Sequence, residues 1–139
     1  MATACEQARA AGAKRALELP VSVAAHSRLM LPAAEVFMEH LSSIEIRSPA
    51  IPVVHNVDVK PHRDPTEIRS VLKQQLYSSV KWDSTLEYLA DLGYTDCYEC
   101  GPGKVLTGLV RRSEASISCI PLGTRDVIES ENKKSNYRA

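Results

Sequence analysis

Short strand-like segments alternate with longer amphipathic segments along this 139-residue chain. Four segments are typical of β-strands, at residues 16–23, 51–59, 96–99 and 116–122. Between them, apolar residues recur with the i, i+3, i+4 spacing of helices that bury one face. Strands that alternate with helices usually pair in parallel, because each helix carries the chain back across the sheet. The sequence therefore predicts an α/β fold with a largely parallel sheet.

The expected helices are bounded by residues that commonly begin or end a helix. Residues 3–11 suit a first helix that stops at Gly12. The segment from Asp64 to Glu67 resembles a capping box with a proline in the first helical turn, and it predicts the start of another helix. Ser84 repeats this signal for a helix that ends at Gly93.

Two of these helices have a buried face that can be read from their apolar residues. The face of the helix that follows Pro32 consists of Ala33, Val36, Phe37, His40, Leu41 and Ile44. The inner face of the helix that follows Glu67 consists of Ile68, Val71, Leu72, Gln75 and Leu76. We therefore expect His40 to be a partnered core residue. A glutamine among aliphatic residues is tolerable where it lines a site.

Composition and charge exclude several classes of partner. Seventeen basic and seventeen acidic residues give a formal net charge of zero, whereas nucleic-acid and membrane surfaces select clustered Lys and Arg. We therefore expect neither of these partners. The four cysteines suggest no disulfide framework, which favours a reducing compartment. A cytoplasmic location is expected, or an organellar one if the source is eukaryotic.

Two short motifs could bind a ligand, and each has a simpler structural explanation. Cys97 and Cys100 form a single C-x-x-C, which supplies two of the four ligands of a structural zinc site. In a strand this spacing directs the two thiols to opposite faces, so we expect them to pack. The segment 101–104, GPGK, lies between a strand and a helix, where amides could hold a phosphate, but a tight turn explains both glycines. We expect no metal and no covalently bound cofactor.

His26 is a candidate catalytic base because it follows the strand-like segment 21–23 and two alanines. In α/β folds functional side chains lie at the carboxyl ends of strands. A general base also needs a nucleophile and an orienting acceptor, and the sequence contains no G-x-S-x-G motif. The residues alone leave both a structural and a catalytic role open. His55 and His62 belong to no recognisable constellation.

Four blocks of the sequence, in order, resemble one enzyme family. They read LPVSVAAHSRLMLPA, IPVVHNVDVK, KQQLY and CGPGKVLTGL. The similarity extends from about Ala8 to Arg112 and is to the C-terminal part of the malonyl-CoA:acyl carrier protein transacylases. The resemblance implies the acyltransferase fold, an α/β-hydrolase-like fold with a largely parallel sheet. The chain would begin in the last helix and strand of the small ferredoxin-like subdomain.

The resemblance also implies an activity, which is malonyl transfer from malonyl-CoA to the phosphopantetheine thiol of acyl carrier protein in fatty acid biosynthesis. The family uses a ping-pong Ser–His mechanism. Its catalytic histidine corresponds to His26, and the residue whose backbone carbonyl orients that histidine corresponds to Gln75. The serine and the arginine that pairs with the malonyl carboxylate precede these blocks in the family. We therefore expect a C-terminal portion that holds the base, lacks the nucleophile and is inactive alone.

The resemblance divides the chain into three parts. Residues 1–20 would end the ferredoxin-like subdomain, residues 21–123 would form the C-terminal part of the catalytic subdomain, and residues 124–139 would be a fraying polar tail. An alternative function is a non-catalytic interaction module that binds a carrier protein or a complementary half-chain. An upstream reading frame that encodes G-H-S-x-G would favour the enzyme over the module.

Overall fold

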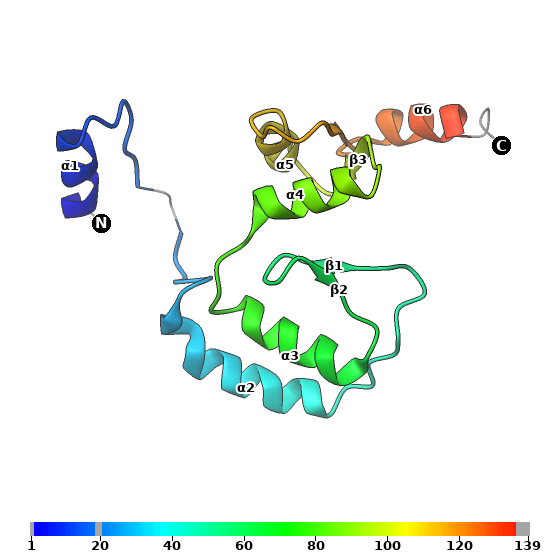
Figure 1. Ribbon diagram of the computed structural model, residues 1–139, viewed down its shortest axis with the longest axis horizontal. Coiled ribbons are helices and arrows are strands. Elements are labelled where there is room, and N and C mark those ends of the chain that lie inside the picture. Colours follow the sequence, from blue (N-terminus) through cyan, green and yellow to red (C-terminus); the bar gives the residue numbers. More distant parts are fainter. Residues whose placement is uncertain (1, 19–20, 136–139) are drawn as a thin grey trace.

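The computed structural model describes residues 2–18 and 21–135, in which helices and strands are interspersed along the chain (Figure 1). The helices are α1 (Ala2–Ala10), α2 (Leu31–Ser42), α3 (Pro65–Gln75), α4 (Trp82–Asp91), α5 (Val105–Val110) and α6 (Arg125–Ser135). A 3₁₀ turn, η1 (Arg28–Met30), precedes α2. The strands are β1 (Val54–His55), β2 (Lys60–Pro61), β3 (Asp96–Glu99) and β4 (Ser118–Pro121). The α/β class predicted from the sequence is therefore confirmed.

The strands form two separate pairs. β3 and β4 are parallel, with Cys97 opposite Cys119, and α5 lies in the crossover between them. β1 and β2 form an antiparallel hairpin. The prediction of a single strand over residues 51–59 was wrong, because the chain turns back there: Val59 has a φ of +62° and its amide donates to the His55 carbonyl at 2.9 Å. Within the described residues, parallel pairing is confined to β3 and β4.

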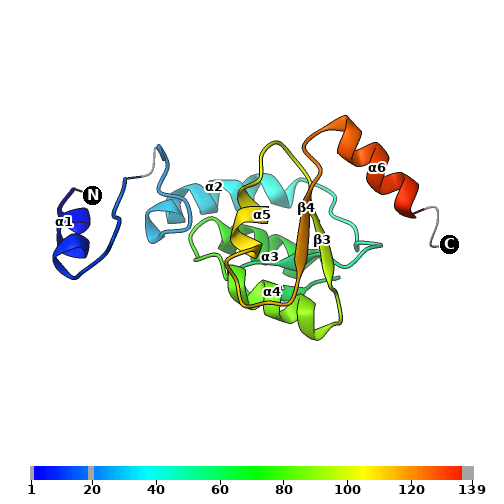
Figure 2. The same ribbon diagram turned by 90° about the horizontal axis from the view of Figure 1, so that it is seen from above.

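The strand predicted for residues 16–23 does not form in the described part of that segment, residues 16–18 and 21–23. Leu19 and Pro20 lie outside the described residues. Figure 2 shows α1 apart from the other helices at the end of this extended segment, as does Figure 1. No described strand runs beside the segment to pair with it, and a strand requires such a partner.

Helix α3 forms where the sequence predicts it and packs beside α2 (Figure 1). The Asp64 side chain accepts hydrogen bonds from the amides of Thr66 and Glu67, at 2.8 and 3.1 Å, which confirms the predicted cap. The Arg69 guanidinium donates to the carbonyls of Leu41 and Ile44, at 3.1 and 2.8 Å. These contacts fix α3 against the end of α2, and the carboxyl end of α3 carries the candidate site described below.

Helix α2 buries a different face from the one that its apolar pattern predicts, because only Leu41 of the predicted residues is buried and Ala34 lies outside that set. Ala34 and Leu41 are buried, whereas Val36 is 53% exposed. His40 is exposed, so its predicted place in the core was wrong. Ala34 and Leu41, seven residues apart, share one face of the helix, whereas Ala33 and Val36 of the predicted face are exposed. The apolar rhythm alone does not determine which side of the helix its neighbours in the fold cover.

A hydrophobic core joins α4, α5 and β4. Its buried residues are Leu86, Val110 and Ile117, and its partly buried neighbours include Trp82, Cys97 and Cys119. Helix α4 begins at Trp82, so the predicted start at Ser84 was wrong and Ser84 lies inside the first turn. The predicted fraying after residue 124 was also wrong for residues 125–135, which form α6. Side-chain pairs one turn apart stabilise α6, from Arg125 to Glu129 and from Glu131 to Lys134.

The chain exposes more surface than a compact monomer of its size. Its accessible area is 10747 Å², against roughly 7,100 Å² from the usual scaling with mass. Large apolar side chains contribute to this surface, among them Leu17, Val21, Leu29, Ile51 and Val105. No helix in the described ranges is long and apolar enough to span a membrane. An open apolar surface of this extent suits further polypeptide contacts.

Candidate active site

His26 lies in a sharp turn just before η1. Its φ is +61°, in the left-handed region that non-glycine residues seldom adopt and that His visits more readily than most. The Ser27 hydroxyl donates to the Ala24 carbonyl at 2.7 Å, and the His26 amide donates to the Leu76 carbonyl at 2.9 Å. The backbone of His26 is therefore held in place both by this turn and by the end of α3.

The imidazole of His26 is oriented by two backbone carbonyls. Its Nδ1 lies 3.0 Å from the oxygen of Gln75 and 3.2 Å from the oxygen of Ser78. Because a carbonyl oxygen can only accept, Nδ1 carries the hydrogen, and the lone pair of the neutral ring is then on Nε2. This tautomer is the one that a general base needs when Nε2 is the reacting atom.

The end of α3 can supply these acceptors because the last carbonyls of a helix have no partner within the helix. The Gln75 and Leu76 carbonyls belong to this group, and His26 donates to both of them. The structure thus brings together two candidate residues that are 49 positions apart in the sequence. The contacts with the Leu76 and Ser78 carbonyls were not predicted. Every residue type has a backbone carbonyl, so the sequence does not show which of them accepts a hydrogen bond.

The Glu99 carboxylate binds backbone amides at the start of α5, directly after the GPGK segment. It accepts from the amides of Leu106 and Thr107, at 2.9 and 2.8 Å, and from the Thr107 hydroxyl at 2.6 Å. Gly101 and Gly103 have φ values of +140° and +98°, which a tight turn requires. The GPGK segment is therefore a turn that places the amino-terminal end of α5 against the buried carboxylate of Glu99.

Cys97 and Cys100 do not lie together in one strand. Cys97 is in β3 beside Cys119 of β4, whereas Cys100 is exposed beyond the end of β3. Burial first, and then its hydrogen bond with Cys119, raise the pKa of Cys97 to about 12. A thiol with so high a pKa is protonated at neutral pH and is a weak nucleophile and metal ligand. Among the described residues, no group of three or more metal-ligating side chains occurs.

His62 and His55 lie side by side on the β1–β2 hairpin, with ring centroids 5.6 Å apart. His62 contacts Asp58 at 2.7 Å and Glu67 at 3.3 Å. The hydrogen bond with Asp58, and more weakly that with Glu67, raise the pKa of His62. His55 is buried and contacts the side chain of Gln75. The two histidines therefore do belong to a constellation, which their spacing in the sequence did not reveal.

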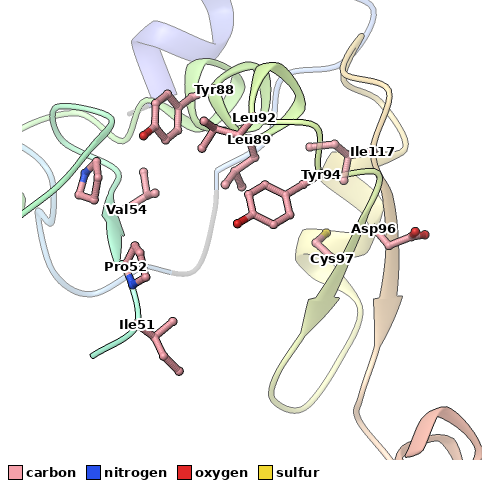
Figure 3. Close-up of a pocket in the computed structure, with 11 residues that line it drawn as sticks. Ile51, Pro52, Val54, Tyr88, Leu89, Leu92, Tyr94, Asp96, Cys97 and Ile117 are labelled. Atoms are coloured by element: carbon pink, nitrogen blue, oxygen red, sulfur yellow. The ribbon is translucent and has the colours of Figure 1, made fainter. Parts of the chain in front are cut away.

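An apolar groove lies between the segment before β1, helix α4 and strand β3 (Figure 3). Its volume is about 410 Å³. The lining side chains are mainly aliphatic and aromatic, among them Ile51, Val54, Leu89, Leu92, Tyr94 and Ile117. Neither His26 nor Gln75 lines it. The groove is therefore distinct from the histidine site.

Acidification is expected to destabilise the contact between β3 and α5 through Glu99. The Thr107 hydroxyl, followed by backbone amides of α5, holds the pKa of Glu99 below its ordinary value. A carboxylate with a depressed folded-state pKa stabilises the fold above its unfolded pKa, and this contribution is lost as the pH falls through the folded value. We expect the urea midpoint to fall between about pH 6 and about pH 3, and to fall less steeply in Glu99→Gln.

The exposed Glu114 provides the control for this measurement, because Glu114→Gln removes a carboxylate of the same type without a cap. Its pH dependence should match that of the unmodified chain. An unchanged slope in Glu99→Gln would show that the cap does not contribute to the acid sensitivity of the fold.

Comparisons of sequence identify bacterial relatives. The malonyl CoA-acyl carrier protein transacylase of Escherichia coli is 52% identical over 104 residues, which are 75% of this chain and 34% of that protein. The protein of the same name from Bacillus subtilis is 39% identical over 126 residues, which are 91% of this chain and 40% of that protein. The chain therefore spans about a third of the length of the curated relatives it matches. No protein-family model matches the chain.

Comparisons of structure agree with those of sequence. The malonyl CoA-acyl carrier protein transacylase of Coxiella burnetii has 39% identity and a TM-score of 0.88, over 94% of this chain and 42% of that one. A malonyl-transacylase in complex with a type II PKS acyl-carrier protein has 40% identity and a TM-score of 0.90, with the same coverage. The resemblance predicted from the sequence is confirmed, and the chain is homologous to a part of the malonyl-CoA:acyl carrier protein transacylases.

Proposed function

We propose that this chain supplies the general base for malonyl transfer from malonyl-CoA to the phosphopantetheine thiol of acyl carrier protein. The nucleophilic serine would come from polypeptide that this sequence does not contain. The observation that supports the proposal is the contact between His26 Nδ1 and the Gln75 carbonyl at 3.0 Å, which leaves the Nε2 lone pair for chemistry. The names of the relatives support the choice of substrates.

The proposed reaction has two halves in which His26 moves one proton back and forth. In the first, Nε2 takes the serine hydroxyl proton as the serine oxygen attacks the thioester carbonyl, and the departing CoA sulfur takes that proton. In the second, Nε2 takes the carrier thiol proton as the sulfur attacks the serine ester, and the serine oxygen takes it back. The Gln75 carbonyl would stabilise the imidazolium in both halves and would keep the ring in one orientation.

The proposed organisation follows the same homology. Residues 1–20 would belong to the end of a ferredoxin-like subdomain, residues 21–123 to the catalytic subdomain, and residues 124–139 to a polar extension of which 125–135 are helical. We place the protein in a reducing compartment such as the cytoplasm. The free state of all four cysteines supports this location.

The purified chain alone is expected to form no malonyl ester, because its sequence has no G-x-S-x-G nucleophile. The measurement is retention of label from radiolabelled malonyl-CoA after denaturation. Joining the chain to the serine-bearing part of a relative, such as the Bacillus subtilis protein, should produce both the ester and transfer to carrier protein. A stable ester on the chain alone would contradict the proposal, and so would a joined protein that folds without activity.

The matched control is the same joined protein with the elbow serine replaced by alanine. It should fold and bind malonyl-CoA as the active form does, and it should retain no radiolabel after denaturation. This control separates a missing nucleophile from a failure of the two parts to assemble.

A non-catalytic interaction module is the second candidate, and the apolar groove of Figure 3 favours it. A complementary half-chain could fill this groove and cover the exposed apolar residues around it. The joined protein distinguishes the two functions. An assembled but inactive protein whose His26 lies near the serine would support the module, whereas transfer activity would support the enzyme.

A further inference from the structure

Gln75 makes two separate sets of contacts at the end of α3. Its backbone carbonyl accepts from His26, as described above. Its side-chain Nε2 donates to Asn56 Oδ1 at 2.9 Å, and its Oε1 lies 3.5 Å from Nδ1 of His55. The shorter of these side-chain contacts is the one with Asn56. The residue that orients the imidazole is thus itself attached to the β1–β2 hairpin.

Asn56 is well placed to act as an anchor because its own position is fixed on both sides. The preceding residue, His55, belongs to β1, is 8% exposed, and accepts from the Val59 amide at 2.9 Å. The Asn56 carbonyl accepts from the Lys81 amide at 2.8 Å, at the start of α4. Asn56 therefore connects the hairpin, the end of α3 and the start of α4.

The position of this anchor matters because the last turn of a helix is the part that frays most readily. A displacement of about 1 Å at a catalytic group can reduce the rate by about 100-fold. We propose that Asn56 is a positioning residue for His26: it holds the Gln75 side chain, and thereby keeps the Gln75 carbonyl on Nδ1. This inference rests on the proposed function for its consequence in catalysis, but its structural claim can be measured without activity.

The first test uses the ring tautomer of His26, measured by nitrogen NMR on the full chain with labelled histidine, under conditions where the ring is neutral. A histidine free in water favours the Nε2–H form, so a dominant Nδ1–H form reports the contacts with the Gln75 and Ser78 carbonyls, of which the Gln75 contact is the shorter. Asn56→Ala should lower the ratio of Nδ1–H to Nε2–H by about 10-fold. Asn56→Asp keeps an acceptor oxygen and should restore most of the ratio. Gln74→Ala, at an exposed neighbouring position, should leave it unchanged.

The second test uses the joined protein and asks whether Asn56 and Gln75 act as one unit. Asn56→Ala and Gln75→Ala should each lower kcat/KM by about 10-fold, mainly through kcat, and the double variant should be no worse than either. If the losses of transition-state stabilisation in the two single variants add up in the double variant, the proposal is wrong.

The two tests separate failure of this inference from failure of the proposed function. If Asn56→Ala is folded and the tautomer ratio does not change, the positioning role is wrong whatever the joined protein does. If the ratio changes as expected and the joined protein is inactive, the positioning contact holds and the proposed function fails. Should Asn56→Ala not fold, Gln75→Ala removes the same hydrogen bond from the other side and decides the outcome.

Discussion

Replacing His26 by alanine is expected to lower malonyl transfer by about 100-fold or more in the joined protein, as for loss of a general base. The substitution removes the proton acceptor from both halves of the proposed reaction. His26 is exposed, so little packing is lost with the ring. The measurement is steady-state transfer to carrier protein, alongside a thermal unfolding curve. His26→Asn is a useful second variant, because asparagine tolerates the left-handed backbone at this position.

The control for this experiment is His40→Ala. His40 is exposed on α2, so its replacement should change neither turnover nor stability appreciably. A second comparison concerns Gln75. Gln75→Pro should abolish transfer because proline disrupts the end of the helix that presents the carbonyl, whereas Gln75→Ala keeps the carbonyl and should be affected far less. Undiminished transfer by folded His26→Ala would return this histidine to a structural role.

Replacing Leu86 by alanine is expected to lower the free energy of unfolding by about 2 to 5 kcal/mol. Leu86 is 2% exposed and lies at the centre of the core that joins α4, α5 and β4. A small domain has a total stability of about 5 to 15 kcal/mol, so this variant should be largely unfolded at modest urea concentrations. The single tryptophan, Trp82, packs against the same core, and its fluorescence reports the transition directly.

Leu92→Ala is the matched control for Leu86→Ala. It removes the same atoms from the residue that follows α4, where the side chain is 57% exposed. Its effect should stay within about 0.5 kcal/mol. Equal losses in the two variants would contradict the assignment of the core to the inner face of α4.

Features with a local cause could be predicted from the sequence. The cap of α3 depends on Asp64 and the two residues after Pro65, and it forms as predicted. Strand β3 covers residues 96–99, as its pattern indicates. Gly93 follows α4 with a φ of +87°, as expected of a helix stop. Each of these signals acts over a few residues, so distant parts of the chain do not alter it.

Features that depend on distant partners could not be predicted in this way. The apolar segment 51–59 reads as a continuous strand, but a two-residue strand forms and then the chain turns. His40 shares the apolar rhythm of α2, yet the position of α3 decides which face is buried. The anchor at Asn56 depends on an amide of Gln75 that is 19 residues away. No local pattern carries that information.

The histidine site was found by homology with the family, and the geometry adds a reason that the residues alone did not supply. His26 could be singled out by its position after an apolar segment, but its orienting group is a main-chain atom of Gln75. A side-chain acceptor such as aspartate would have been visible in the sequence as a partner. The variants above test the proposed chemical roles of His26 and Gln75.

The choice of a main-chain acceptor has a consequence for how such a protein tolerates genetic change. Every residue type carries a carbonyl, so a missense mutation at codon 75 cannot delete the oxygen that faces Nδ1 of His26. The acceptor oxygen is therefore retained when the residue type at position 75 changes. A mutation displaces this oxygen only if it distorts the end of α3 or weakens the contact with Asn56. Lineages could therefore exchange this residue for any type that keeps the helix intact without losing the acceptor itself, a route closed to sites whose acceptor is a carboxylate side chain.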